Sequence, residues 1–192
     1  MNTRCDIILF VILTVTTKFA CEAHASHDTV TVYSLSTREL HSSVIPPTVF
    51  EMTNLRRLTI TGMDCDANLV NELGDTTCWA LKAIPIDISK LRNLEILELR
   101  VNSIQRVPIE IKALTKLKTL DLTDNPGLEE IENVVELHNL EELILYGCYL
   151  TKLPAAIGRL KKLRLLALTG NNIEAGELER LRKILPNCDI KF

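Results

Sequence analysis

Aromatic side chains are scarce in this chain of 192 residues, where Phe, Tyr and Trp make up 4% although 46% of the residues are hydrophobic. The apolar content is therefore aliphatic, with 32 Leu and 18 Ile. With only seven Gly and seven Pro, the chain has too few of either for a collagen-like or low-complexity sequence. The composition predicts a folded core made mainly of leucine, in one domain or at most two small ones.

The chain also lacks a strong excess of charge, because 22 Lys and Arg stand against 25 Asp and Glu, for a net formal charge of -3. This balance argues against a basic nucleic-acid-binding arm or a polybasic membrane patch as the organising feature. The 24% of charged residues and the high apolar content together exclude a disordered chain.

Motifs of common catalytic sites are missing as well. The sequence contains no glycine-rich phosphate loop, no Cys-x-x-Cys pair and no Gly-x-Ser-x-Gly elbow. The His24-x-x-His27-Asp28 spacing would suit a metal only if the N-terminal segment stays attached. We therefore predict no enzyme activity, no cofactor and no metal site.

Residues 1–25 have the pattern of a secretion signal. Arg4 precedes a mostly apolar stretch over residues 7–15, which is too short to span a bilayer, and an Ala-x-Ala cleavage pattern ends at Ala25. Two alternatives are an uncleaved anchor and lipid attachment at Cys21. The signal predicts a secreted, extracellular or periplasmic protein without stable membrane insertion after cleavage.

An internal repeat with a period of 23 residues dominates the rest of the sequence. Four copies open at leucines spaced 23 apart, from Leu94 to Leu163, and follow the pattern Leu-x-x-Leu-x-Leu-x-x-Asn/Cys. Second halves of the form Val/Leu-Pro-x-x-Ile-x-x-Leu begin at Val107 and Leu153, and we expect their prolines at the first position of a helical turn, where a missing N–H costs little. The Asn or Cys position, which we call the ladder, is occupied by Asn102, Asn125, Cys148 and Asn171.

This pattern resembles the leucine-rich repeats, and its Leu-Pro-x-x-Ile half is similar to the 23-residue subclass of Erbin- and Scribble-type scaffolds. Residues 185–192 resemble the ends of small exported bacterial proteins of this family. The resemblance implies an α/β solenoid, a short right-handed horseshoe arc. Its parallel β-sheet would line the concave face, with short helical or irregular segments on the convex face. It also implies protein binding in general, without naming the partner.

The repeat has a physical explanation. Alternating leucines of a short strand point inward while the residues between them face solvent. An Asn amide in the following turn both donates and accepts hydrogen bonds, so it can satisfy backbone groups that the turn leaves unpaired. One copy cannot bury its leucines alone, whereas a stack of copies can.

The repeats divide the chain into five parts. The signal over residues 1–25 is followed by an N-terminal cap and partial repeat over 26–54 and an irregular repeat over 55–93. The regular repeats occupy 94–173, and a C-terminal cap over 174–192 contains a helix that ends before a proline and a last strand. Caps are expected because an open end would expose leucines and strand edge.

The irregular repeat contains an insertion at residues 64–80, because it is 39 residues long where the others have 23. Met63 stands at its ladder position and cannot supply the hydrogen bonds of an amide. Cys65 and Cys78 bracket the insertion, and we predict a disulfide between them that stabilises the loop by about 3 kcal/mol. Cys148 and Cys188 are either free thiols or a second disulfide, and their places in non-adjacent repeats favour free thiols.

The outward-facing strand positions form the predicted binding surface. With about seven strands at ~4.8 Å, the sheet would be about 30 Å across, enough for an unidentified protein burying ~800 Å² per side. Tyr146 is either an interface anchor or an incidental exposed aromatic. Glu98 and Asp121 form either a solvated or partner-facing pair, or a carboxylate pair for acid–base work or for binding a cation. The predicted contact residues are Ile96, Glu98, Arg100, Asp121, Ile144 and Tyr146.

The prediction from sequence is therefore a monomeric exported protein that binds another macromolecule through its concave sheet, flanked by the disulfide-closed loop. The alternative is a structural component of a cell surface or extracellular layer, in which the caps or lateral surfaces associate.

Overall fold

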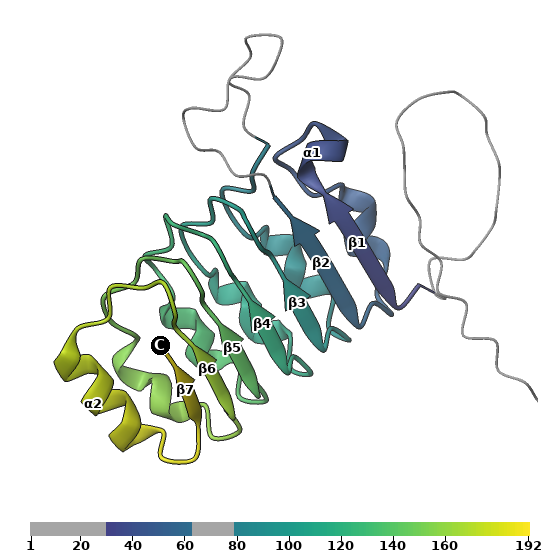
Figure 1. Cartoon of the computed structure of the whole chain (residues 1–192). Helices are drawn as coiled ribbons and strands as arrows, with labels where there is room; N and C mark the ends of the chain where they lie inside the picture. The colour runs from purple at the N-terminus through teal and green to yellow at the C-terminus, as the bar shows by residue number, and fades with distance from the viewer. Residues whose placement is uncertain (1–29, 63–78) are drawn as a thin grey trace, which may run out of the picture.

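Seven parallel strands lie side by side in one open, curved sheet (Figure 1), in the order in which they occur along the chain. The computed structural model describes residues 30–62 and 79–192, so the predicted signal and most of the insertion lie outside the described residues. The strands are β1 (Val32–Ser36), β2 (Arg57–Thr61), β3 (Ile96–Glu98), β4 (Thr119–Asp121), β5 (Glu142–Ile144), β6 (Leu165–Ala167) and β7 (Asp189–Lys191). The predicted leucine-rich-repeat solenoid is confirmed.

Short helices cover the other face of the sheet (Figure 1). Five single-turn 3-10 helices belong to successive repeats: η2 (Pro47–Glu51), η3 (Ile86–Lys90), η4 (Ile109–Ala113), η5 (Glu132–Glu136) and η6 (Ala155–Arg159). Pro108 lies just before η4 and Pro154 just before η6, one residue earlier than the first helical position expected from sequence. Their carbonyls accept the first hydrogen bonds of these turns, from Ile111 N at 3.1 Å and Ile157 N at 3.0 Å.

The strand register follows the repeat period. Leu97 pairs with Leu120, 23 positions further on, while Leu58 pairs with Leu97, which is 39 positions further on. The extra residues of the irregular repeat therefore stay outside the sheet, and the pairing of β2 with β3 is the same as elsewhere.

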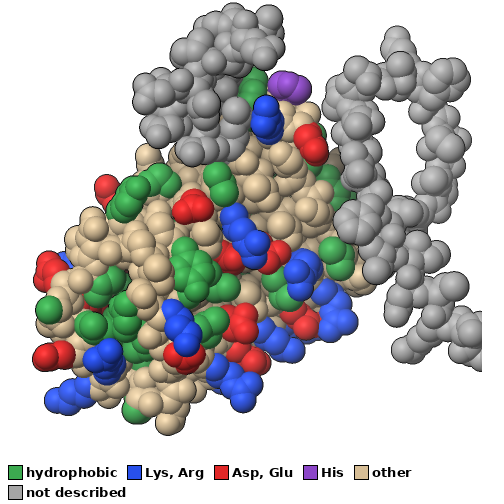
Figure 2. All heavy atoms as spheres, viewed as in Figure 1, with side chains coloured by type: hydrophobic (Ala, Val, Ile, Leu, Met, Phe, Trp, Pro, Cys, Tyr) green, Lys and Arg blue, Asp and Glu red, His purple; other side chains and the backbone are tan. Residues whose placement is uncertain are grey.

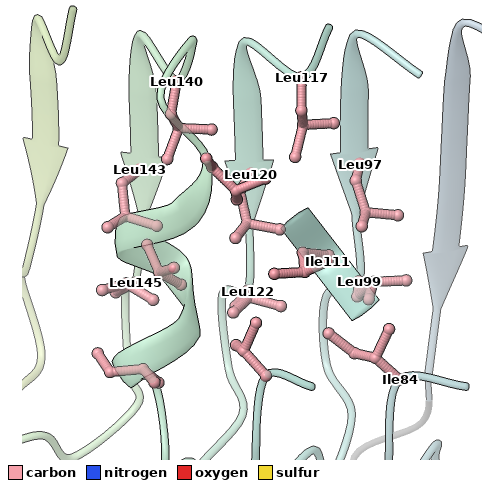
Figure 3. Close-up of a cluster of buried hydrophobic side chains, with 14 of the residues drawn as sticks. Ile84, Leu97, Leu99, Ile111, Leu117, Leu120, Leu122, Leu140, Leu143 and Leu145 are labelled. Carbon is pink, nitrogen blue, oxygen red and sulfur yellow. The ribbon is translucent and has the colours of Figure 1, made fainter. Parts of the chain in front are cut away.

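The core is a set of leucine layers, one side chain per repeat. Leu97, Leu120 and Leu143 are fully buried and point from neighbouring strands to the same side of the sheet (Figure 3). The convex side closes over them with residues such as Ile111, also fully buried. Each such side chain contributes roughly 2 kcal/mol on burial, and only stacked neighbours make that burial possible.

Both ends of the solenoid are capped. At the N-terminal end, β1 places Tyr33 beside Leu58, so Val32 faces the concave side and is 53% exposed. The helix α1 (Thr37–Leu40) follows β1 directly. At the C-terminal end, α2 (Ala175–Ile184) buries Leu181. Among the described residues, no helix is long and apolar enough to cross a bilayer.

Candidate functional site

The outward-facing side chains of the sheet stand in columns that run across the strands. The register aligns Thr59, Glu98, Asp121, Ile144 and Ala167 in a middle column. Toward the strand beginnings lies a second column of Arg57, Ile96, Thr119, Glu142 and Leu165. Arg100 and Tyr146 each lie two residues beyond the middle column. The middle column thus has a polar half over β2 to β4 and an apolar half over β5 and β6, whereas the second column contains both polar and apolar side chains.

An ion-pair network occupies the polar half. The Arg100 guanidinium donates from Nε to Asp121 Oδ2 at 2.6 Å and from a terminal nitrogen to Glu98 Oε1 at 2.6 Å. Thr59 donates its hydroxyl to the other Glu98 oxygen at 2.6 Å. Asp121 Oδ1 accepts from the backbone N–H of Thr123 at 2.9 Å and from its hydroxyl at 2.6 Å. The structure therefore brings the predicted Glu98, Arg100 and Asp121 together.

This network bears on the acid–base alternative for Glu98 and Asp121. Each of their four carboxylate oxygens accepts a hydrogen bond from within the protein, and the Asp121 side chain is only 3% exposed. A general acid or base must exchange a proton with a substrate. Oxygens that already accept hydrogen bonds from the protein are poorly suited to this role. Within residues 30–62 and 79–192, no cluster of His, Cys, Asp and Glu is suited to a metal ion. The arrangement holds the Arg100 side chain, which is 44% exposed, in place.

The apolar half combines predicted residues with ones that the sequence analysis did not select. Ile144 is half-buried and Tyr146 is 38% exposed, both contributed by the β5 repeat. Leu165 and Ala167 continue the two columns on β6, and Ala167 is fully buried. Ile96 lies apart from this group, on β3 beside Arg57. In the sequence, the adjacent Leu165 and Leu166 break the alternation of polar and apolar residues along their strand. This break indicates an apolar side chain on the outward face of β6.

The ladder residues bond the turns of the preceding repeat. Asn125 accepts a hydrogen bond from Ile104 N at 3.0 Å and donates to Leu99 O at 2.9 Å. Asn171 makes the equivalent bonds to Leu150 N at 2.9 Å and to Leu145 O at 2.6 Å. Each amide thus joins two successive turns, and Asn125 is fully buried while doing so.

Cys148 takes the ladder position in the third regular copy. Its thiol donates to Leu122 O at 3.1 Å, which replaces one of the bonds of an amide. The preceding turn does not need a side-chain acceptor at this position, because its Leu128 N–H donates to the backbone oxygen of Asn125 at 3.0 Å. Burial raises the pKa of Cys148 to about 11. Cys148 and the half-buried Cys188 are both free thiols.

The insertion leaves and rejoins the solenoid at neighbouring points. Gly62 N donates to Arg100 O at 2.9 Å on the exit side, and Leu81 N donates to Asn102 Oδ1 at 2.9 Å on the return side. Any side chain at Gly62 would overlap Asn102 and the neighbouring carbonyl. The ring of Trp79 meets His41 of the N-terminal cap edge-on, with centroids 6.1 Å apart. The predicted disulfide partners Cys65 and Cys78 lie outside the described residues.

Comparison with known families matches most of the regular repeats. The family described as Leucine Rich repeats (2 copies) matches residues 92–136, and the family Leucine Rich Repeat matches residues 139–160. Residues 92–136 and 139–160 of this chain are therefore leucine-rich repeats. The matched ranges contain β3 to β5 and all six predicted contact residues. Four of these residues lie on the strands, and Arg100 and Tyr146 lie two residues after β3 and β5.

Curated proteins of very different kinds are similar to part of this chain. The human volume-regulated anion channel subunit LRRC8A is 37% identical over 89 residues, covering 45% of this chain and 11% of that protein. The Arabidopsis thaliana disease resistance-like protein DSC1 is 35% identical over 86 residues, covering 44% of this chain and 7% of that protein. The chain spans about a tenth of the length of these curated relatives.

Two solved leucine-rich repeat structures resemble the chain over most of its length. A protein of Leptospira interrogans aligns with a TM-score of 0.61 at 25% identity, covering 86% of this chain and 49% of that one. The leucine-rich repeat domain of the type III effector XopL aligns with a TM-score of 0.56 at 25% identity, covering 78% and 56% respectively. The structural resemblance therefore extends beyond the regular repeats.

Proposed function

We propose that this leucine-rich repeat protein binds another protein through its concave sheet, with Ile144, Tyr146 and Leu165 as the anchor. This proposal rests on the middle column of the sheet, which is polar and internally paired over β2 to β4 and apolar over β5 and β6. Leucine-rich repeat domains bind proteins in general, and the solenoid offers a preformed surface of the required kind. We infer that the chain is a binding module and not an enzyme.

The energetics favour the apolar half as the anchor. Glu98, Arg100 and Asp121 already satisfy one another, so a partner that displaced these bonds would gain little from them. Apolar area gains about 25 cal/mol per Å² on burial, and an exposed Tyr at the centre of a surface is a common hot-spot residue. The polar residues would instead set specificity and orientation at the edge of the contact.

We further propose that the protein is exported, as its N-terminal pattern suggests, and acts outside the cell or in the periplasm. A disulfide between Cys65 and Cys78 would then close the insertion into a flanking contact loop. The Leu-Pro-x-x-Ile repeats support assignment to the Erbin- and Scribble-like subclass, in a small exported form. Mass spectrometry of the exported product, before and after reduction, tests cleavage at Ala25 and the disulfide together.

Affinity capture from the native surroundings tests the binding surface. We expect Tyr146→Ala with Arg100→Glu to lose a partner that wild-type protein recovers. The matched control is Ile109→Ala, because Ile109 is exposed at 44% on the convex side. Equal recovery of every partner by the double variant and wild type would rule out the concave face.

A structural assembly role is the second candidate, and one feature of the convex side favours it. Ile86 and Ile109 begin the neighbouring helices η3 and η4 and are 66% and 44% exposed. Adjacent exposed isoleucines suit contact between copies in a layer. Sedimentation velocity over a wide concentration range separates the two functions, because a monomer at all concentrations argues against assembly.

A further inference from the structure

A band of positive charge runs along the edge of the sheet where the strands begin (Figure 2). We call this band the rim and define it by the residues that flank the opening leucine of each repeat. It carries seven exposed cationic side chains and only two carboxylates, in a chain with a net charge of -3. The charged rim residues are Arg56, Arg92, Glu95, Lys116, Lys118, Glu141, Lys161, Lys162 and Arg164.

Two rim lysines are held in place by asparagines of the preceding repeats. Lys116 donates from Nζ to Asn93 Oδ1 at 2.7 Å, and Lys162 donates to Asn139 Oδ1 at 2.6 Å. The asparagines are fixed in turn, because each donates to a backbone carbonyl one repeat earlier, at 2.9 and 2.7 Å. Each ammonium group uses one of its three protons in this way, so two remain for a ligand. Because the two lysine side chains are already held in place, they lose less conformational entropy when a ligand binds.

The two carboxylates of the rim are paired from within it. Arg56 donates from Nε to Glu95 at 2.7 Å, and Lys118 approaches the same carboxylate at 3.5 Å. The hydrogen bond from Arg56 holds the pKa of Glu95 below its ordinary value. Glu141 lies 3.9 Å from Arg164. The positive charge that neither carboxylate pairs lies on Arg92, Lys116, Lys161 and Lys162.

Two open hollows lie side by side along the rim. One, of about 250 Å³, is lined by Lys116, Lys118 and Lys162 together with Thr115, Asn139 and the two glutamates. The other, of about 420 Å³, shares Glu95 and Lys116 with the first and extends toward Arg56. Lys116 and Lys162 belong to repeats two apart, which at ~4.8 Å per strand spaces the positive groups by about 10 Å.

We propose that the rim binds an acidic protein segment in polyproline II form, with carboxylates at about every third residue. A polyproline II chain has three residues per turn and rises ~3.1 Å per residue, so every third side chain lies on the same face, about 9 Å from the next, which matches the spacing of the lysine positions. Glu141 belongs to the repeat between the two lysines and Glu95 to the repeat before Lys116, and the peptide has neutral residues at both places. A nucleic acid fits less well, because its closely spaced phosphates would face these glutamates and the rim has no Phe, Tyr or Trp for base stacking.

Fluorescence anisotropy with labelled synthetic peptides tests this proposal. We expect saturable binding of a peptide with Glu at every third position, weakening as salt is added. An isomeric peptide with contiguous Glu should bind more weakly, because part of its charge would face Glu95 and Glu141. Lys116→Ser with Lys162→Ser should weaken binding by about tenfold, since two exposed ion pairs are lost. The control Lys152→Ser with Lys183→Ser removes the same charge from exposed positions outside the rim.

Several outcomes would overturn the proposal. These are equal weakening by the rim and control variants, equal affinity for the two peptides, or tighter binding of a single-stranded oligonucleotide or heparin fragment than of the peptide. Tyr146→Ala should leave peptide binding unchanged. Failure of the rim is thus distinguishable from failure of the concave-face binding proposed above.

Discussion

The side-chain oxygen of Asn102 accepts a hydrogen bond from the backbone N–H of Leu81 at 2.9 Å, although the insertion separates Leu81 from the strand of its own repeat. In the next repeat, Asn125 accepts the same bond from Ile104 at 3.0 Å. Leu81 therefore occupies the place of Ile104 in its turn. Asn102 also donates to Ile60 O at 3.3 Å, so one amide connects the two ends of the interrupted repeat.

Removing this amide should destabilise the fold. Asn102→Ala leaves Leu81 N and Ile60 O without their side-chain partner in a buried turn, and we expect a loss of about 2 to 3 kcal/mol in the free energy of unfolding. Urea denaturation measures it. Asn172→Ala is the matched control, because Asn172 is exposed and should change stability by less than about 0.5 kcal/mol. Equal losses would contradict the ladder's role.

Val101 should be a site where glycine raises stability. Its φ of 54° is left-handed, and the same place in later repeats is held by Asp124, Gly147 and Gly170, also at positive φ. A β-branched residue is disfavoured there by about 1 to 2 kcal/mol. Glycine removes this strain, but it loses more backbone entropy on folding, which offsets part of the gain in stability. We expect Val101→Gly to raise stability by about 1 kcal/mol in thermal unfolding. Gly147→Val should lower it, and a drop for Val101→Gly would show that Val101 packing outweighs the strain.

Acid should weaken the attachment of the C-terminal cap. Glu177 accepts hydrogen bonds from Arg180 at 2.6 Å and from Leu153 N at 2.8 Å, and its pKa is lowered, first by the bond from Arg180. The unfolded state then binds the proton more tightly. The stabilisation is complete above the ordinary value of 4.5 and is lost as the pH falls through the lower folded-state pKa.

The change Glu177→Gln measures this contribution. We expect the variant to be less stable than wild type by about 1 kcal/mol at pH 7, with the difference disappearing in strong acid. The exposed Glu179 of the same helix provides the control variant Glu179→Gln. A difference that stayed constant from neutral to acidic pH would contradict the assignment.

The two described cysteines should resist alkylation in the folded protein. Burial raises the pKa of both Cys148 and Cys188 to about 11, so at pH 8 only about one thiol in a thousand is a thiolate. We expect slow labelling by iodoacetamide in native buffer and rapid labelling in denaturant, measured by mass spectrometry. A native rate equal to that in denaturant would contradict the buried thiol at Cys148.

The fold could be predicted from the sequence because its determinants are local and periodic. Leucines every 23 residues fix both the strand and the layer that its side chains fill, and the register of Leu97 with Leu120 follows from the period alone. The prolines show the limit of this reasoning. Pattern alone did not distinguish the first helical position from the residue before it, where Pro108 and Pro154 lie.

The binding surface could be predicted only in part. Outward positions follow from strand alternation, and Glu98, Arg100 and Asp121 do lie together. That all four carboxylate oxygens are engaged depends on rotamers, which no pattern specifies. Leu165 and Ala167 also fall on outward positions by strand alternation, but they were not among the predicted contact residues. The role of Asn93 and Asn139 in fixing the rim lysines is likewise visible only when neighbouring repeats are stacked.

Site-specific photocrosslinking tests the central claim most directly. A photoreactive residue placed at Leu165 on the concave sheet, or at Ile109 on the convex side, reports which face touches a captured partner. We predict crosslinks to a partner protein from position 165 and none from position 109. Crosslinks from position 109 alone would contradict binding through the concave sheet.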